Sequence, residues 1–195
     1  MRLFVALDIE EAIRTRIADF IGEMRGLAPD ARWLRPESVH ITLKFIGERS
    51  EDEAAKIQQA LEAIKAAKFD VDIRGFGFFP NPQAPRVFWI GVEAGPALTS
   101  LASNVDASLV PLGIAKEGHE YNPHLTLARS GKGSGSPRKQ KGDVPNQSFQ
   151  RLQEKLANYP QSEFGTMTAS DFFLYQSKLG PGGSKYTKLA RFILQ

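Results

Sequence analysis

The stretch Val39-His40-Ile41-Thr42-Leu43-Lys44-Phe45-Ile46 alternates apolar and polar side chains, and its centre returns later in the chain as His124-Leu125-Thr126-Leu127. Alternation over this length predicts a β-strand, in which every second side chain lies on the same face. The histidine and the threonine of each copy should therefore share one face of their strand. The two copies use two of the three histidines in the chain.

Two imidazoles and two hydroxyls on one surface suit acid–base chemistry at a phosphate group. One imidazole can accept a proton while the other donates one, and hydroxyls can donate hydrogen bonds to the non-bridging phosphate oxygens. A single His-x-Thr-Leu carries little information, because histidine and threonine also occur in strands for packing reasons. Repetition makes the difference. We expect the histidines, His40 and His124, to be catalytic. The threonines, Thr42 and Thr126, should bind phosphate.

A phosphate site also needs positive charge, and each motif strand supplies a candidate cation. Under strict alternation Lys44 is the next residue on the face of His40 and Thr42, so we expect it to contact phosphate. Arg129 ends the second motif strand, where alternation points it away from His124. A phosphate contact by Arg129 therefore requires a bulge or the end of the strand at that point. The alternative for Arg129 is a surface salt bridge or a cap at the end of the strand.

The third histidine and the aromatic residues leave further alternatives open. His119 lies five residues before His124, and a zinc site could be formed by His40, His119 and His124. Metal binding would not explain the repeated threonine, and no ligand at matching spacing precedes His40, so we expect no metal and no cofactor. Aromatic rings can stack on a base or pack in the core; the candidates are Trp33, Phe45, Trp89 and Tyr175.

Hydrophobic spacing and turn residues predict the remaining elements. In chain order they are a strand 2–7, a helix 10–25, the motif strand 39–46, a helix 51–67, a hairpin of 69–79 with 86–92, a helix 96–112, the motif strand 124–129, a helix 147–158 and a hairpin of 164–175 with 185–194. The order helix, motif strand, helix, hairpin thus occurs twice. It defines pseudo-repeats of about 10–93 and 96–195.

The spacing of landmarks predicts an insertion in the second half. The motifs lie 84 residues apart, whereas Phe69 and its counterpart Phe164 lie 95 residues apart. The extra residues fall at about 131–143, whose glycine, serine and lysine content is typical of a flexible surface loop.

Length and composition describe an ordinary globular protein. The 195 residues are 42% hydrophobic and 24% charged, which suits a single domain with a substantial core. We expect an α+β fold of two pseudo-symmetric lobes, each with an antiparallel sheet and outer helices, and a cleft between them. The absence of cysteine excludes disulfides and thiolate chemistry, and a net charge of +3 fits a polyanionic partner. With no long apolar segment and no signal peptide, a cytoplasmic protein without a membrane partner is expected.

Three segments carry a family resemblance: Met1 to Asp8, Val39 to Glu48 and Tyr121 to Arg129. They resemble the two-histidine phosphoesterase superfamily, and within it the bacterial and archaeal RNA 2',3'-cyclic phosphodiesterases, the LigT-like proteins also called 2'-5' RNA ligases. The resemblance implies a bilobal α+β fold with the active site between the lobes. It implies metal-independent cleavage of a 2',3'-cyclic phosphate to a 2'-phosphate and a 3'-hydroxyl.

The resemblance also assigns roles to the motif residues. It implies that His40 is the proton donor, that His124 is the proton acceptor and that the motif threonines bind phosphate. The implied partner is RNA with a cyclic phosphate end, with tRNA halves joined through 2'-5' linkages as one candidate, and the implied state is a monomer. The long insertion after Arg129 departs from the family pattern and leaves the contacts at that side of the substrate entrance open.

Two other functions remain as alternatives. An enzyme of this kind could act on another cyclic phosphate, such as a cyclic ADP-ribose phosphate. The same cleft could also serve a non-catalytic module that binds RNA ends, although two intact motifs favour an enzyme.

Overall fold

The structure is a computed structural model that describes residues 1–131, 147–160, 162–180 and 183–195. Most of the expected insertion at 131–143 therefore lies outside the described residues. The described elements are β1 (Arg2–Leu7), α1 (Glu11–Met24), η1 (Arg25–Leu27), β2 (Arg32–Trp33), η2 (Pro36–Ser38), β3 (Ile41–Glu48), α2 (Glu51–Glu62), β4 (Phe69–Phe79), β5 (Val87–Glu93), α3 (Gly95–Leu109), η3 (Val110–Leu112), β6 (His124–Arg129), η4 (Gln147–Phe149), α4 (Gln150–Ala157), β7 (Glu163–Ala169), β8 (Asp171–Gly180) and β9 (Gly183–Ile193).

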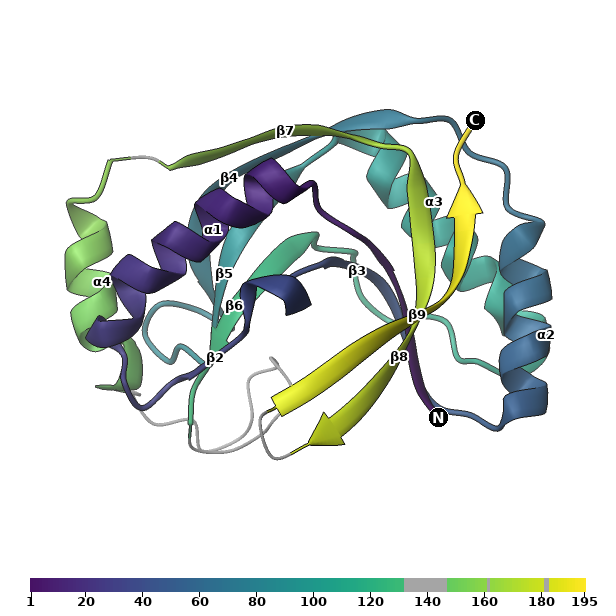
Figure 1. Ribbon diagram of the computed structural model, residues 1–195, viewed down its shortest axis with the longest axis horizontal. Helices are drawn as coiled ribbons and strands as arrows, with labels where there is room; N and C mark the ends of the chain where they lie inside the picture. Colours follow the sequence, from purple (N-terminus) through teal and green to yellow (C-terminus); the bar gives the residue numbers. More distant parts are fainter. Residues whose placement is uncertain (132–146, 161, 181–182) are drawn as a thin grey trace.

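The strands form one curled sheet in the order β7-β4-β5-β6-β3-β1-β8-β9, with β2 paired to β6. All of its pairings are antiparallel. The two motif strands, β3 and β6, are neighbours at its centre. Figure 1 shows α1 and α4 on the side of β4, β5 and β6, and α2 and α3 on the opposite side. The expected two-lobed α+β architecture is confirmed.

The lobes are not the two halves of the chain. The hairpin of β4 and β5 forms as expected, but β5 pairs with β6, the motif strand of the second half. The strand expected over 164–175 is interrupted at Ser170: β7 before it pairs with β4, and β8 after it pairs with β1. Residue patterns predict where a strand lies, whereas its partner is chosen by tertiary packing.

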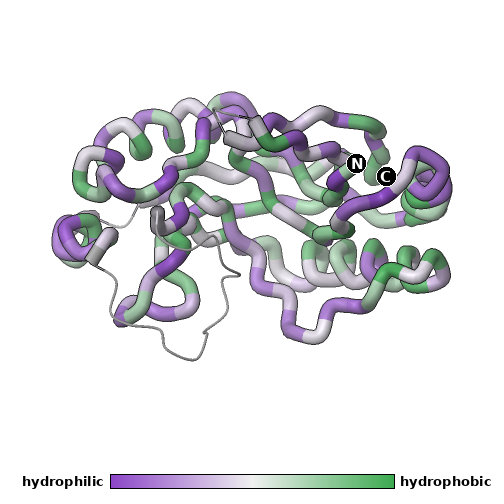
Figure 2. Tube along the Cα trace, turned by 90° about the horizontal axis from the view of Figure 1, so that it is seen from below, coloured by the Kyte–Doolittle hydropathy of each residue, from purple (hydrophilic) through white to green (hydrophobic). Residues whose placement is uncertain are grey.

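The helices form where amphipathic spacing and caps predict them. The stripe of α1 is buried, with Ile13, Ile17 and Phe20 among its members, and Figure 2 shows hydrophobic and hydrophilic residues alternating along the helices. At the start of α2, Ser50 and Glu53 form the expected capping box. None of the helices in the described ranges is long and apolar enough to cross a membrane.

One predicted helix is too long. The helix expected over 51–67 ends at Glu62. Beyond it the backbone pairs with the chain end: Lys68 N donates to Gln195 O, and Gln195 N donates to Ala66 O. The helix stops because these backbone groups have tertiary partners that a local pattern does not reveal.

Candidate active site

The two motifs lie side by side. Ile41 of β3 is paired with Leu125 of β6 in antiparallel register. Extending this register by one residue on each side sets His40 opposite Thr126, and Thr42 opposite His124. Side chains directly opposite each other in such a pair have Cβ atoms about 4.5–5.5 Å apart. The structure thus brings together the four side chains that the motifs single out.

The motif leucines and isoleucine show which face is which. Ile41, Leu125 and Leu127 are fully buried in the main hydrophobic core, whereas the histidines and threonines are half-buried. The apolar positions therefore anchor both strands to the helix side of the sheet. The polar positions line the opposite face, which we call the cleft face.

Each histidine is held by the same local contact. His40 Nδ1 lies 2.7 Å from Ser38 O, and His124 Nδ1 lies 2.8 Å from Asn122 O. A carbonyl oxygen can only accept, so each Nδ1 carries the hydrogen. Nε2 of each ring is then the atom that can take or give a proton.

Burial makes both imidazoles weakly basic. It lowers the pKa of His40 to about 4, and the charges of Arg129 and Arg14 act in the same direction. The Ser38 carbonyl and the Asp8 carboxylate oppose this shift. Burial also lowers the pKa of His124, helped by Arg129. Both rings are therefore neutral near neutral pH, and a bound anion would favour their protonated forms.

Aromatic rings supply much of this burial. Around His40, ring centroids lie at 4.7 Å for Phe4, 5.2 Å for Tyr186 and 6.1 Å for Tyr175. The rings of His124 and Phe79 are nearly perpendicular, with their centroids 4.9 Å apart. The histidines thus lie in surroundings of low polarity, where electrostatic interactions with a substrate are strong.

Arg129 reaches the cleft face through a β-bulge. In the pairing of β5 with β6, Phe88 is opposite Ala128 and Trp89 is opposite Thr126, which leaves Leu127 as the extra residue. The bulge reverses the alternation and places Arg129 on the face of Thr126. The charge of Arg129 lowers the pKa of both histidines, so it acts on both. The bulge that a phosphate contact required is present.

The prediction for Lys44 is wrong, because β3 contains a matching bulge. Val5 is opposite Lys44 and Ala6 is opposite Thr42, which leaves Leu43 as the extra residue. Lys44 is turned to the helix side, where it is only 3% exposed. There it contacts Asp106 Oδ1 at 2.6 Å, Glu117 Oε1 at 3.2 Å and Ala115 O at 2.7 Å.

The same bulge exposes a different residue on the cleft face. Phe45 is opposite Phe4 in the register and is 59% exposed. Of the other aromatic candidates, Trp33 belongs to the core, since its Nε1 donates to Ala28 O and its ring packs on Phe88. Trp89 and Tyr175 lie with the cleft residues.

The third histidine lies elsewhere. His119 is 54% exposed, and its Nε2 is 3.9 Å from Glu117 Oε2. Within the described ranges, no three His, Cys, Asp or Glu side chains are grouped so that they could hold a metal ion.

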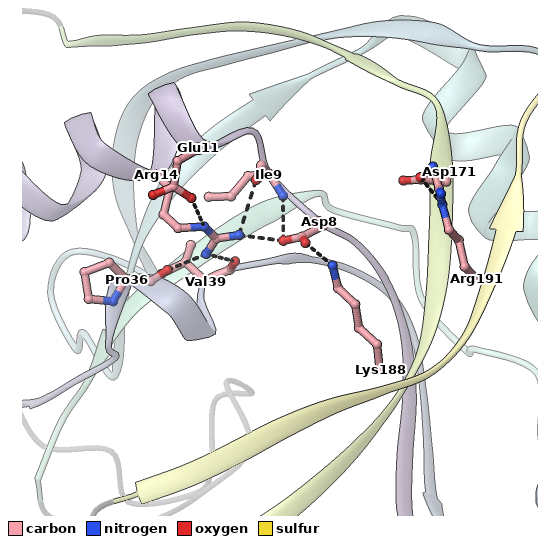
Figure 3. A network of polar contacts seen from close by, with 9 residues as sticks. All are labelled: Asp8, Ile9, Glu11, Arg14, Pro36, Val39, Asp171, Lys188 and Arg191. Atoms are coloured by element: carbon pink, nitrogen blue, oxygen red, sulfur yellow. Dashed lines mark hydrogen bonds and ion pairs between the residues drawn. The ribbon is translucent and has the colours of Figure 1, made fainter.

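Sequence reasoning missed a polar network beside His40. Arg14 of α1 pairs with Asp8 at 2.5 Å, and Asp8 also pairs with Lys188 of β9 (Figure 3). Extending the register of Leu7 with Ile41 sets Asp8 opposite His40. A cavity of about 540 Å³ adjoins these residues. Lys188 is 180 residues from Asp8 in the chain, and only the place of Asp8 at the end of the first strand could have suggested a role.

Comparisons with known proteins identify the family of the chain. The family model for LigT-like phosphoesterases matches residues 7–89 and again 90–186. An RNA 2',3'-cyclic phosphodiesterase of Archaeoglobus fulgidus is 35% identical over 98% of this chain and 99% of its own length. One of Methanocaldococcus jannaschii is 34% identical over 95% and 96%.

Solved structures share the fold. TT0787 of Thermus thermophilus superposes with a TM-score of 0.77 at 29% identity, covering 100% of this chain and 98% of that one. Escherichia coli LigT complexed with 3'-AMP gives a TM-score of 0.76 at 22% identity, covering 99% and 97%. This chain belongs to the family of LigT-like phosphoesterases.

Proposed function

We propose that this protein hydrolyses the 2',3'-cyclic phosphate end of RNA to a 2'-phosphate without a metal ion. One observation carries the proposal: two histidines with the same Nδ1 contact stand on one face, each opposite a threonine, with Arg129 beside them. The names of the archaeal relatives support the choice of substrate.

The proposed reaction is a displacement at phosphorus. His124 Nε2 takes a proton from water, and the water oxygen attacks the phosphorus. The bond from phosphorus to O3' breaks, and protonated His40 Nε2 gives its proton to O3'. The products are a 2'-phosphate and a 3'-hydroxyl. Between turnovers, the proton gained by His124 returns to solvent and His40 is reprotonated.

The charge in the transition state falls on the non-bridging oxygens. Thr42 and Thr126 donate hydroxyl hydrogen bonds to them, and the Arg129 guanidinium supplies positive charge. The anion itself raises the pKa of the buried His40 and so helps to load the donor with a proton. The carboxylate of Asp8 favours protonated His40 in the same way, while burial opposes it until the anion is bound. The choice of His40 as donor and His124 as acceptor rests on the family resemblance.

Ligation would use the same site. If the 5'-hydroxyl of a second RNA replaces water as the nucleophile, the same displacement yields a 2'-5' linkage and a 3'-hydroxyl. Joined tRNA halves are the candidate product. The protein acts as a monomer in this proposal, because both motifs come from one chain.

The test compares substrates and single variants. A nucleoside 2',3'-cyclic phosphate, an oligonucleotide with the same end and a cyclic ADP-ribose phosphate are incubated with the protein, and phosphorus NMR assigns the product phosphate. His40→Gln and His124→Gln should each lower kcat by about 10²–10⁴-fold, whereas His119→Gln should change little. Turnover of the ADP-ribose compound alone, or binding of RNA ends without turnover, would refute the proposal.

A further inference from the structure

Two largely buried cations lie outside the reacting groups, and each is bonded to the segment that precedes one of the histidines. We propose that Arg14 positions His40 and that Lys44 positions His124, through separate sets of contacts. The inference rests on the proposed function only for its kinetic readout, since the ring geometry that it concerns exists without substrate.

Arg14 contacts the backbone on both sides of Ser38, through Pro36 and Val39 (Figure 3). Its Nη1 donates to Pro36 O at 2.6 Å and to Val39 O at 3.4 Å. These two acceptors flank Ser38, whose carbonyl oxygen accepts from His40 Nδ1. Fixing the backbone on both sides of Ser38 fixes the direction of its carbonyl, and thereby the tautomer and the orientation of the ring.

The guanidinium is itself held in place. Its Nη2 donates to Asp8 Oδ1 at 2.5 Å and to Ile9 O at 3.3 Å. Asp8 also accepts from Ile9 N and from Lys188. The Arg14 side chain is only 12% exposed. A planar fork that bridges an aspartate and three backbone carbonyls has a geometry that lysine cannot reproduce.

Lys44 acts on the segment that precedes His124. Its Nζ donates to Ala115 O and pairs with Asp106, whose carboxylate accepts from Glu117 N at 3.1 Å. These contacts tie the chain after α3 to strand β3. The described chain then runs from Glu117 to Asn122, whose carbonyl oxygen accepts from His124 Nδ1.

A second contact joins the same two segments closer to the histidine. Tyr121 Oη donates to Thr42 O at 2.9 Å. Tyr121 is adjacent to Asn122, so this bond fixes the peptide next to the carbonyl that orients His124. Strand β3 thus carries His40 on its own face and positions His124 through Lys44 and the backbone of Thr42.

The experiment reads the ring nitrogens by nitrogen NMR of histidine-labelled protein without substrate. In the wild type both rings should show the hydrogen on Nδ1. Arg14→Met should give His40 a mixture of tautomers and leave His124 unchanged. Lys44→Met combined with Asp106→Leu, which leaves no buried carboxylate unpaired because Glu117 is 46% exposed, should do the reverse. Tyr121→Phe should act on His124 in the same direction.

Two gentler changes keep the test decisive if a variant is poorly folded. Arg14→Lys retains the charge opposite Asp8 but loses the fork, so it should still mix the His40 tautomers. Tyr121→Phe removes only one hydroxyl group. With a cyclic nucleotide as substrate, we expect kcat to fall by about 100-fold in each of these two variants, while KM changes little.

Three outcomes would overturn the inference. In the first, His40 keeps a single tautomer in both Arg14 variants. In the second, His124 keeps its tautomer in the Lys44 double variant and in Tyr121→Phe. In the third, every variant disturbs both rings equally, which would indicate general loosening. Separate ring effects in a protein that turns over no cyclic phosphate would refute the proposed function and leave this inference standing.

Discussion

Replacing His40 by glutamine should make the protein more resistant to acid. The pKa of His40 is about 4 in the folded protein and about 6.5 when the ring is exposed. Between these pH values the unfolded chain binds more protons than the folded protein. The free energy of unfolding is therefore highest, with respect to His40, above pH 6.5, and it falls as the pH drops toward 4. The shift of 2.5 pKa units corresponds to about 3 kcal/mol at full protonation. At about pH 5 the loss is roughly 2 kcal/mol.

Urea unfolding at about pH 7.5 and about pH 5 measures this loss. The wild type should lose roughly 2 kcal/mol more between the two conditions than His40→Gln, because the variant has no imidazole to protonate. The protonation of carboxylates also changes the stability, but it does so equally in both proteins, so the difference between them reports on His40 alone. His119→Gln is the matched control: His119 is more than half exposed, so this variant should follow the wild type. Parallel losses in the wild type and His40→Gln would show that His40 is not buried in the way described.

Three further predictions concern the cleft. Arg129→Gln should lower kcat/KM by about 100-fold and move the pH–rate profile upward, because the charge of Arg129 lowers the pKa of both histidines; an unchanged profile would contradict this. Gly77→Ala would place a Cβ 2.3 Å from the ring of Trp89, so calorimetry should show that the free energy of unfolding falls by about 1–3 kcal/mol. The control Gly22→Ala has open space around the new Cβ and should not lower the stability. Exhaustive chelation should leave turnover of a cyclic nucleotide intact, and restoration of lost activity by zinc or magnesium would refute the two-histidine mechanism.

The motif strands and their neighbourhood were predictable because their pattern is local. Alternation places a histidine and a threonine on one face, and repetition predicts that two such faces meet. Alternation fails one residue later, at Leu43 and Leu127, where each strand contains a bulge. A bulge depends on the partner strand, and the apolar residue that forms it looks like any other core position. The cation expected from the pattern, Lys44, is therefore buried against α3 and the segment that follows it.

The network around Arg14 was not predictable for a different reason. Its members come from α1, the end of β1 and β9, and the last two are 180 residues apart in the chain. Each is an ordinary charged residue in its local context. The pairings of β3 with β1, of β1 with β8 and of β8 with β9 bring Asp8 and Lys188 beside His40, and pairing partners are a property of the whole sheet.

The two bulges also explain how near-identical motifs can take different roles. Both occur at the leucine of the motif, so the second residue after each bulge returns to the cleft face. In the first motif that residue is the exposed Phe45, and in the second it is Arg129, 84 positions later. The histidines share one tautomer and one kind of burial, but only His40 has an aspartate opposite it in the sheet. The donor and the acceptor need different protonation states at the same pH. Two similar imidazoles in different surroundings can meet this requirement, so that one donates a proton and the other accepts one. Arg129 lowers the pKa of both histidines, whereas the Asp8 carboxylate acts on His40. The difference on which the proposed roles depend therefore lies in Asp8 and not in the motifs themselves.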